Sequence, residues 1–336
     1  MTDLRVGIVG CGWVGRHRHL PAYLRHRRVK LVGVADAQPD RAREAVADLR
    51  GVPWLPSIDA LLDLQPDAVS ICTPPWEHAR LAIAALNAGA HVLTEKPMAM
   101  STEEARRMIE AAKAADRQLC TVHNFLTSRA MSHASRLVGA LEEIEYVSAV
   151  QLSSMRRRLP TWYELLPGGL LFDELPHMLY MTRRFLGELQ LDGVRARWNG
   201  DRSHLATCEI QLRGARAHGQ VLAVFDSPVS EWHVVVVTRR GVVDVDLFRE
   251  FASYVPADGS HGSTDILRTS VSAIGGHAKG FVGSGVRLAA RRLSWGHEAF
   301  IGQFVDAVLD GGPLPVSMQE SLDVVALTDD ILRALV

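Results

Sequence analysis

The chain has 336 residues, 47% of them hydrophobic, and a formal net charge of −1. This length predicts two domains, each large enough to bury its own core. The balanced charge argues against a nucleic-acid-binding protein, and no apolar run approaches the ~20 residues that a membrane-spanning helix needs. We therefore expect neither a nucleic acid nor a membrane among the partners.

The N-terminus leads directly into a strand-like run at residues 4–9, which leaves no room for a signal peptide and predicts a cytoplasmic protein. Four cysteines lie far apart and lack the C-x-x-C spacing of zinc sites and redox pairs. They are Cys11, Cys72, Cys120 and Cys208. We expect buried, reduced thiols rather than a disulfide framework, and no metal site.

A glycine-rich turn follows the first strand at once, and a helix is expected after it over residues 13–26. Its sequence, Gly10-Cys11-Gly12-Trp13-Val14-Gly15, has the G-x-G-x-x-G pattern of dinucleotide sites. The first glycine allows a tight turn, the second lets backbone N–H groups approach a pyrophosphate, and the third allows the helix to pack closely on the strand. We expect the whole turn, including Trp13 and Val14, to contact a dinucleotide at the positive end of the helix dipole.

An acidic residue stands at the end of the second predicted strand, residues 30–35. Asp36 follows Gly15 by about 20 residues, the spacing expected for the acid that binds the ribose hydroxyls of NAD. A carboxylate there would repel the 2′-phosphate of NADP, so NAD is the expected cofactor, while the nearby Arg41 and Arg43 leave NADP open. The alternative for Asp36 is a turn aspartate that binds no ligand.

Strands and helices alternate as far as residue 122. Further strands are predicted at residues 68–71, 90–94 and 118–122, and helices at residues 39–49, 57–62, 76–88 and 102–115. This order predicts a right-handed, doubly wound parallel sheet, and hence an α/β nucleotide-binding domain over residues 1–122.

The segment Glu95-Lys96-Pro97 comes directly after the strand at residues 90–94. It therefore lies at the carboxyl edge, where open parallel sheets bind ligands. Pro97 restricts Lys96 to an extended backbone, which would hold the lysine amine in one direction. A lysine before a proline is also common in surface turns, but the nucleotide-binding context favours a catalytic Lys96 with Glu95 beside the cofactor.

A second edge segment, Thr73-Pro74, follows the strand at residues 68–71. Its backbone is expected to pass the pyrophosphate or the nicotinamide, because it lies at the same edge of the sheet. His78 begins the next helix, and contact with the cofactor and a structural role are equal alternatives for it. Asn124 follows the last strand of the domain and is a candidate to contact nicotinamide or substrate.

The second half of the chain is rich in strand-like runs with alternating polar and apolar residues. They lie at residues 144–152, 191–198, 205–212, 216–225, 232–238 and 242–247, with Arg239-Arg240-Gly241 as a hairpin turn and helices at residues 296–309 and 319–335. The pattern predicts an α+β domain over residues 123–336, built on a mostly antiparallel sheet with helices on one face.

Three motifs occur together in this chain: the glycines of the first turn, Thr73-Pro74 with His78, and Glu95-Lys96-Pro97. In this combination the chain resembles, over nearly its whole length, the Gfo/Idh/MocA oxidoreductases, which are named after glucose–fructose oxidoreductase and inositol dehydrogenase. The resemblance implies an N-terminal Rossmann domain and a C-terminal domain with a large open sheet. It also implies NAD(P)-dependent oxidation or reduction of a sugar, cyclitol or sugar-nucleotide hydroxyl, and a homodimer or homotetramer.

A second motif of that family, G-G-G-x-L-x-D-x-G-x-H-x-x-D, matches residues 167–180 in part. Asp173 and His177 keep their places four residues apart, on one face of a helix. Pro167, Leu175 and Tyr180 replace two glycines and the last aspartate. The resemblance assigns proton transfer to His177 and Lys96, since an imidazole titrates near pH ~6.5. Asp173 would position the substrate, and Tyr180 could contribute a hydroxyl.

Three further segments carry weaker signals. Trp162 and Tyr163 precede the glycine turn and are candidates to line the substrate pocket, with core packing as the alternative. The run at residues 156–158 consists of three arginines and is expected to be solvated rather than bound to an anionic substrate. Residues 256–295 are rich in Gly, Ser and His, and a flexible surface insertion is the expected structure. A lid, a contact for a sugar-nucleotide diphosphate and a dimer-contact helix are the alternatives there.

These observations predict an NAD(P)-dependent oxidoreductase that moves a hydride between nicotinamide and a hydroxyl or keto carbon of a sugar-like molecule. A lyase, epimerase or hydrolase that recycles a tightly bound NAD would use the same residues. An imine or alkene reductase would change only the electrophile. A regulatory protein that senses a ligand without catalysis is the alternative from another class, and the retained Lys96, Asp173 and His177 argue against it.

Overall fold

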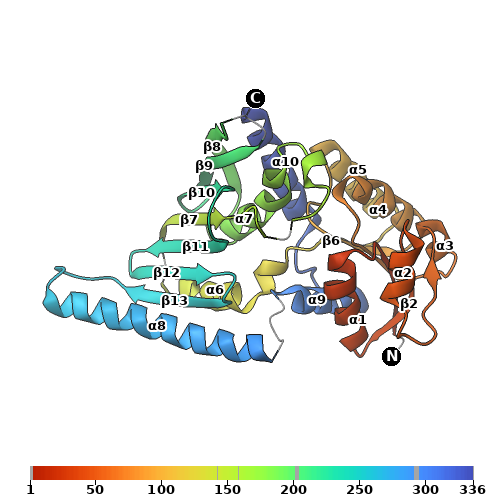
Figure 1. Cartoon of the computed structure of the whole chain (residues 1–336), viewed down its shortest axis with the longest axis horizontal. Coiled ribbons are helices and arrows are strands. Elements are labelled where there is room, and N and C mark those ends of the chain that lie inside the picture. Colours follow the sequence, from red (N-terminus) through yellow and green to blue (C-terminus); the bar gives the residue numbers. More distant parts are fainter. Residues whose placement is uncertain (1–2, 142, 158, 201–203, 291–294, 336) are drawn as a thin grey trace. The chain divides into compact units, whose positions relative to one another are not determined.

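The computed structural model describes residues 3–335 except 142, 158, 201–203 and 291–294 (Figure 1). The chain folds into two compact units. The first comprises Met1–His123 and His297–Ala326, and the second comprises Asn124–Gly296 and Leu327–Val336. The boundary predicted from the sequence lies at residue 122, and the structure assigns the later segment His297–Ala326 to the first unit as well.

The first unit contains a six-stranded sheet in which every pair of neighbouring strands is parallel. Its order is β3-β2-β1-β4-β5-β6, the order of doubly wound dinucleotide-binding domains. The strands are β1 (Leu4–Val9), β2 (Val29–Ala35), β3 (Trp54–Leu55), β4 (Ala68–Ile71), β5 (His91–Thr94) and β6 (Leu119–Thr121). The predicted parallel sheet is confirmed.

Helices connect these strands, as the alternating pattern predicted. A π-helical turn, Gly15–His19, leads into α1 (Leu20–Arg25). The others in this unit are α2 (Pro39–Ala45), α3 (Ile58–Leu62), α4 (His78–Asn87), α5 (Thr102–Ala114), α9 (His297–Asp310) and the first part of α10 (Met318–Ala334). Helix α5 begins where Ser101 Oγ accepts the Glu104 N–H at 3.2 Å, which is a side-chain cap.

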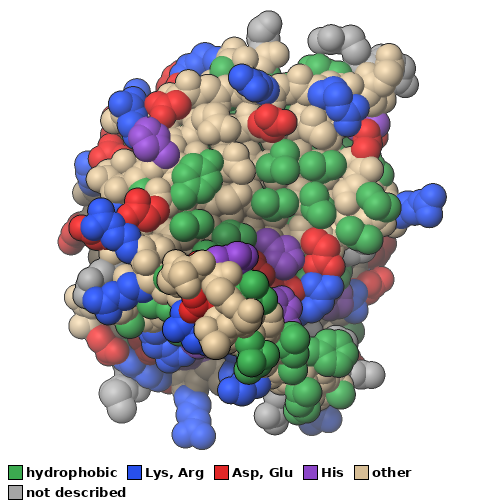
Figure 2. Space-filling view, turned by 90° about the vertical axis from the view of Figure 1, so that its left-hand side faces the viewer, with side chains coloured by type: hydrophobic (Ala, Val, Ile, Leu, Met, Phe, Trp, Pro, Cys, Tyr) green, Lys and Arg blue, Asp and Glu red, His purple; other side chains and the backbone are tan. Residues whose placement is uncertain are grey.

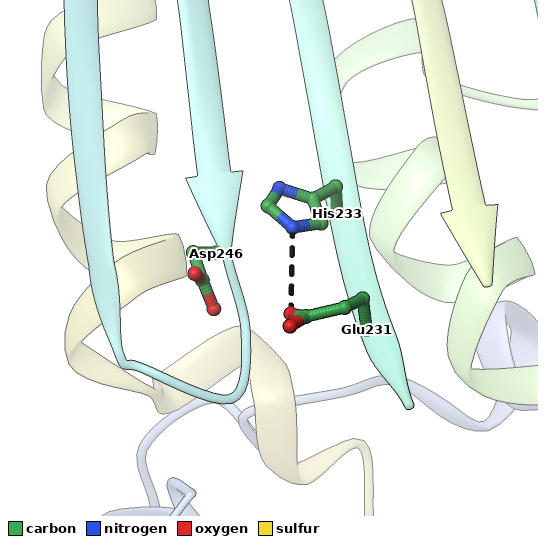
Figure 3. A group of neighbouring side chains, drawn as sticks. All are labelled: Glu231, His233 and Asp246. Atoms are coloured by element: carbon green, nitrogen blue, oxygen red, sulfur yellow. Dashed lines mark ion pairs between the residues drawn. The ribbon is translucent and has the colours of Figure 1, made fainter. Parts of the chain in front are cut away.

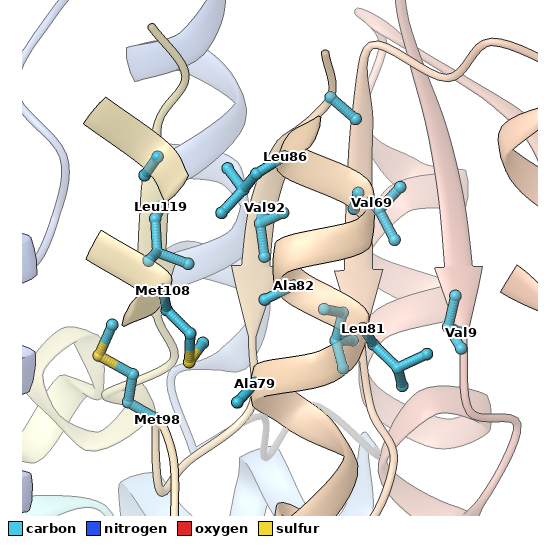
Figure 4. Close-up of a cluster of buried hydrophobic side chains, with 14 of the residues drawn as sticks. Val9, Val69, Ala79, Leu81, Ala82, Leu86, Val92, Met98, Met108 and Leu119 are labelled. Atoms are coloured by element: carbon cyan, nitrogen blue, oxygen red, sulfur yellow. The ribbon is translucent and has the colours of Figure 1, made fainter. Parts of the chain in front are cut away.

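The core of the first unit lies where α4 and α5 pack on the sheet. Leu81, Ala82 and Leu86 of α4 are buried against Val69 of β4 and Val92 of β5 (Figure 4). Small alanines let the helix approach the strands closely, while the larger side chains fill the space between them. This packing fixes the strand ends from which the edge segments at residues 73–74 and 95–97 continue.

The second unit contains a seven-stranded sheet of order β13-β12-β11-β7-β10-β9-β8. Only β7 and β10 pair in parallel within the described residues, so the predicted mostly antiparallel sheet is confirmed. The strands are β7 (Ile144–Leu152), β8 (Leu189–Trp198), β9 (Leu205–Gly214), β10 (His218–Val224), β11 (Glu231–Thr238), β12 (Gly241–Asp246) and β13 (Phe251–Pro256). The last of these was not predicted.

Two helices, α6 (Arg129–Leu141) and α7 (Leu170–Leu186), pack on this sheet. Along β11 and β7 every second side chain is buried and most of the others are half-buried, which leaves one face of the sheet more open than the other. The predicted hairpin is present, since Thr238 pairs with Gly241 across the turn.

The segment expected to be a flexible insertion contains a long helix instead. Helix α8 (Ser263–Ala289) runs along β13 (Figure 1). A side chain at Gly280 would place its Cβ 2.3 Å from the ring of Phe251, and one at Gly276 would meet Ser253 at 2.9 Å. The glycines that suggested flexibility are therefore the residues that let the helix lie close to the strand.

All four cysteines are free and buried. Burial raises the pKa of the Cys11, Cys120 and Cys208 thiols to about 12 and also raises that of Cys72. Cys11, Cys72 and Cys120 belong to the first unit, and Cys208 belongs to the second.

Candidate functional site

The turn after β1 is shaped by contacts that exclude side chains at two of its glycines. Gly10 has φ +94°, and a Cβ there would lie 2.6 Å from the backbone of Cys72. A Cβ on Gly15 would lie 2.1 Å from the carbonyl oxygen of Gly10. At Gly12 nothing in the described part of the chain lies within 4 Å of the corresponding position, so its backbone faces open space. This arrangement fits a dinucleotide, whose pyrophosphate needs an unobstructed approach to backbone N–H groups.

Asp36 fixes the same turn from the end of β2. Its two carboxylate oxygens accept the N–H groups of Cys11 at 2.7 Å and of Gln38 at 2.8 Å. The carboxylate therefore performs the role of a turn aspartate. Each oxygen can accept a further hydrogen bond, so this role is compatible with binding a ribose diol.

The other residues expected around the turn are more exposed. Trp13 is 42% exposed, and the guanidinium of Arg18 lies 4.9 Å from the centre of its ring. Val14 is half-buried and Arg41 is exposed on α2. The neighbouring Arg43 pairs with Asp40 at 3.2 Å.

His78 links the two edge segments of the sheet. Its ring nitrogens lie 2.8 Å from the carbonyl oxygen of Pro97 and 2.9 Å from that of Thr73. Burial lowers the pKa of this imidazole, against the two carbonyl contacts. The ring is buried and both nitrogens face backbone oxygens, which favours the structural alternative for His78. Through it, Thr73 and Pro97 are held at a fixed separation beside Pro74.

Glu95 is a buried carboxylate with two histidines beside it. His19 Nε2 donates to Glu95 Oε1 at 2.8 Å, and His297 Nε2 lies 3.8 Å from the same oxygen. Burial alone would raise the pKa of the Glu95 carboxyl, but the hydrogen bond and charge of His19, with His297 and Lys96, lower it to about 2. The other ring nitrogen of His19 lies 2.7 Å from Ser70 Oγ.

Neither His19 nor His297 was identified from the sequence as part of this cluster. A signal was present for His19, which is a polar residue just before the apolar run of the first helix. Lys96 follows Glu95 directly and is half-buried, and its backbone N–H donates to Glu95 Oε2 at 3.2 Å. The peptide bond between Lys96 and Pro97 is cis. The buried carboxylate thus fixes the backbone from which the lysine side chain extends.

In the second unit, Asn124, His177 and Tyr180 form one hydrogen-bonded chain. Asn124 Nδ2 donates to the carbonyl oxygen of Trp295 at 2.8 Å, which turns its Oδ1 toward the Tyr180 hydroxyl at 3.3 Å. Tyr180 therefore donates to Asn124 and accepts from His177 Nδ1 at 2.7 Å. In this pattern Nδ1 carries the proton of a neutral imidazole, and Nε2 carries the lone pair that can accept one.

Aromatic rings hold this imidazole in place. The ring centres of Phe125 and Trp232 lie 5.2 and 5.5 Å, respectively, from the ring centre of His177. Asp173 is buried one turn earlier on α7, on the same side of the helix as His177. The predicted helix and the i, i+4 placement of these two residues are thus present.

A buried carboxylate next to Asp173 binds one of the three consecutive arginines. Glu174 forms an ion pair with Arg157 and accepts a hydrogen bond from Ser153 Oγ at 3.0 Å. Burial lowers the pKa of the Arg157 guanidinium, and the charge of Asp173 opposes this effect. The expectation of a solvated run is therefore wrong for Arg157, because a buried carboxylate stabilises its charge. Arg158 lies outside the described residues.

Trp162 and Tyr163, the two pocket candidates that precede the glycine turn, are half-buried. Tyr163 begins the 3₁₀ turn Tyr163–Leu165, and its hydroxyl donates to Glu164 at 3.2 Å.

A group of potential metal ligands lies on β11 and β12. One ligand atom each of Glu231, His233 and Asp246 lies within 4.8 Å of the others (Figure 3). Arg249 pairs with Glu231 at 2.5 Å and with Asp246 at 2.6 Å, and its hydrogen bond lowers the pKa of the Glu231 carboxyl. The guanidinium of Arg249 already balances the charge of both carboxylates, so we assign no metal ion to this group.

The parallel sheet, the glycine turn and the acid at the end of β2 define the first unit as a dinucleotide-binding domain of the Rossmann class. Residues 4–123 match the family described as an oxidoreductase family with an NAD-binding Rossmann fold. The chain is 34% identical over 251 residues to UDP-N-acetylglucosamine 3-dehydrogenase of Acidithiobacillus ferrooxidans, a match that covers 73% of this chain and 75% of that protein. It therefore belongs to the Gfo/Idh/MocA family.

A second relative is D-glucoside 3-dehydrogenase of Escherichia coli K12, which is 34% identical over 204 residues. That match covers 58% of this chain and 57% of the relative, so the chain spans little more than half of that protein's length. Among solved structures, the WlbA dehydrogenase of Bordetella pertussis in complex with NADH and UDP-GlcNAcA gives a TM-score of 0.80 at 20% identity. This similarity covers 99% of this chain and 95% of that one, and it shows a shared fold.

The buried pair of His19 and Glu95 predicts a specific loss of stability in acid. The Glu95 carboxyl has a pKa of about 2 in the folded chain, below its ordinary value of 4.5. Its contribution is therefore fully present above pH 4.5 and is lost as the pH falls toward 2. Between pH 4.5 and 2, Glu95→Gln should lose on the order of 3 kcal/mol less unfolding free energy than the wild type. Urea unfolding at a series of pH values in this window measures the difference.

The matched control is Glu110→Gln, which removes an exposed carboxylate from α5. We expect this control to follow the wild-type pH dependence. Parallel curves for Glu95→Gln and wild type would contradict the assignment of the low pKa to Glu95.

Proposed function

We propose that the protein is an NAD-dependent oxidoreductase that interconverts a secondary alcohol and a ketone on a sugar-like substrate. The observation that carries this proposal is the hydrogen-bonded chain at His177, which sets the imidazole to accept a proton at Nε2. Oxidation of an alcohol requires a hydride acceptor and a proton acceptor. Membership of an NAD-binding oxidoreductase family supports NAD as the hydride acceptor, and His177 is the proton acceptor.

The residues of the first unit fit the cofactor as follows. The open backbone at Gly12 would bind the pyrophosphate, and the carboxylate of Asp36 would accept hydrogen bonds from the adenosine ribose. Thr73 and Pro74, held by His78, would flank the nicotinamide half at the edge of the sheet. When bound, NAD supplies a hydride acceptor in one direction and, once reduced, a hydride donor in the other.

The protein's own part in the reaction is the control of the hydroxyl proton. In the direction of oxidation, His177 Nε2 accepts this proton as the carbonyl forms, and Nδ1 keeps its own proton bound to Tyr180. The Tyr180 hydroxyl remains a donor to Asn124, so the imidazole does not need to rotate. Lys96 would donate to the reacting oxygen and stabilise its partial negative charge.

The substrate class is proposed from the relatives and from the polar groups near His177. D-glucoside 3-dehydrogenase and UDP-N-acetylglucosamine 3-dehydrogenase, by their names, oxidise position 3 of a hexose ring. A sugar or cyclitol ring offers several hydroxyls, and the carboxylate of Asp173 is suited to accept hydrogen bonds from those that do not react. We therefore propose that Asp173 positions the ring, with Trp162 and Tyr163 lining the pocket. A cytoplasmic location agrees with four free cysteines.

Lys96→Ala should abolish turnover and leave NAD binding within about threefold of wild type, because the lysine would act on the substrate oxygen rather than hold the pyrophosphate. Cofactor binding is measured by tryptophan quenching with NAD⁺, NADH, NADP⁺ and NADPH. Turnover is measured by absorbance at 340 nm with a panel of glucosides, cyclitols and sugar nucleotides. Lys113→Ala, an exposed lysine of α5, is the control.

Turnover of Lys96→Ala at near the wild-type rate would remove Lys96 from the chemistry. A wild-type protein that binds none of the four nicotinamides would refute the oxidoreductase proposal and favour the regulatory alternative. Cofactor that remains bound through purification would indicate recycling in place, as in a lyase or epimerase.

His177→Gln should lower kcat by roughly 10²–10⁴-fold, the usual loss on removal of a general base. Tyr180→Phe should lower kcat less, because the imidazole remains and loses the hydroxyl that fixes its tautomer. It should displace the acidic limb of the pH profile of kcat for oxidation, where the general base becomes protonated. KM should change little in either variant. Tyr146→Phe on β7 is the control. An unchanged kcat profile in Tyr180→Phe would contradict the positioning role.

We further propose that the protein acts as a homo-oligomer in which a second copy covers the more open face of the seven-stranded sheet. Val150, Leu222 and Val235 lie on this face, on β7, β10 and β11, and are half-buried. Three neighbouring strands that present branched apolar side chains favour a protein partner over water. Val235→Glu should therefore shift the protein to monomers in sedimentation velocity, whereas Val229→Glu should not. A monomeric wild type would refute this proposal.

A further inference from the structure

Exposed apolar side chains are concentrated on α8. Of thirteen large hydrophobic side chains that are exposed in the described part of the chain, seven lie on this helix. They are Ile266, Leu267, Val271, Ile274, Phe281, Val282 and Val286. Figure 2 views the molecule from the end at which α8 begins, and one of the two groups of hydrophobic side chains in this view lies in its lower part, at the height of α8 in Figure 1. Contiguous apolar surface of this kind marks an interaction site.

The exposed side chains form one stripe along the helix. Leu267, Val271, Ile274, Ala278 and Phe281 follow one another at alternating intervals of four and three residues, which places them on one face. Ile274 is 70% exposed and Phe281 is 71% exposed. The glycines at 276 and 280 approach β13, so the helix is fixed to the sheet by its other side. Helix α8 has 27 residues and is about 40 Å long at 1.5 Å per residue, and the stripe from Leu267 to Phe281 covers about half of that length.

The charges on α8 are mainly positive. Arg268 and Lys279 are exposed, and Arg287 is half-buried beside Glu250. Asp265 is the one acidic residue in the sequence of this helix, and it lies 3.6 Å from Arg268. An apolar stripe beside basic side chains is typical of helices that lie in the interface of a membrane. Two more arginines, Arg291 and Arg292, follow in the sequence and lie outside the described residues.

Charge distinguishes between the partners that such a stripe could have. In a symmetric pair the same patch meets itself, so Arg268 and Lys279 would face a second α8 that offers only Asp265 as an acid. An anionic lipid surface provides both an apolar phase for the stripe and negative charges for the basic side chains of α8. Its acyl chains accept the apolar stripe, and its headgroup phosphates pair with the basic side chains.

We propose that α8 binds the second unit to an anionic membrane surface, with its apolar stripe in the acyl boundary and Arg268 and Lys279 at the headgroups. Within the described residues no helix is long and apolar enough to cross a bilayer. The other side of α8 packs on β13, so the stripe is the side that would face the membrane surface. The sequence predicted no membrane partner, because it contains no apolar run of the ~20 residues that a spanning helix needs. A surface helix is fixed by one apolar face and needs no such segment.

The test is cosedimentation of the full chain with two kinds of vesicle, phosphatidylcholine alone and phosphatidylcholine mixed with phosphatidylglycerol. Wild-type protein should sediment with the anionic vesicles and should be released by high salt, which screens the headgroup charge. Replacing Ile274 and Phe281 by Glu should weaken partitioning at least about tenfold, since both side chains would leave the acyl boundary. Lys279→Gln should weaken it roughly fivefold and preserves the stripe.

Leu24→Glu is the matched control, because Leu24 is exposed but lies on α1 of the first unit. It should sediment as wild type does, and thermal melts should show that all variants fold. Wild-type protein that stays in solution with anionic vesicles would overturn the proposal, as would equal sedimentation of the Ile274→Glu, Phe281→Glu variant. Loss of self-association in that variant, without vesicle binding by wild type, would identify a second copy as the occupant and overturn it too.

Discussion

The buried charge of Glu95 is the interaction on which the ligand edge of the first unit depends. A carboxylate removed from water costs several kcal/mol unless it is paired and hydrogen-bonded. His19 from the first helical turn and His297 from α9 both face it, and Lys96 donates its backbone N–H to it. One carboxylate therefore joins the end of β5 to segments at both ends of the chain. The helical turn that follows the glycine turn and the backbone of Lys96 are held in register because both bind this carboxylate.

Local signals in the sequence were sufficient for most of the first unit. Strand runs, glycines and helix caps act over a few residues, so β1, β2 and β4 and the doubly wound order could be predicted from them. The contact between His19 and Glu95 could not be predicted, because these residues are 76 positions apart in the sequence and only the folded sheet brings them together. A histidine in an apolar helix gives no indication of its partner. His78 shows the same limit, since its two carbonyl partners became visible only in three dimensions.

The second unit shows where compositional reasoning fails. Alternating side chains predicted six of its strands. Strand β13 was not predicted, and α8 lies in a stretch whose glycine content suggested flexibility. Gly276 and Gly280 are required by the close approach of the helix to Ser253 and Phe251, a tertiary reason that composition does not reveal. The departure from the family motif at Tyr180 also has a physical explanation. A tyrosine hydroxyl can accept the Nδ1–H of His177, as the aspartate at that position could, without adding a negative charge.

The buried cysteines have a practical consequence. The thiolate is the nucleophilic form of cysteine, and burial keeps these four thiols protonated at neutral pH. They therefore resist alkylation while the surrounding unit is folded and react once it opens. Because Cys208 alone reports on the second unit and the other three report on the first, the chain carries its own labels for the separate unfolding of its two parts.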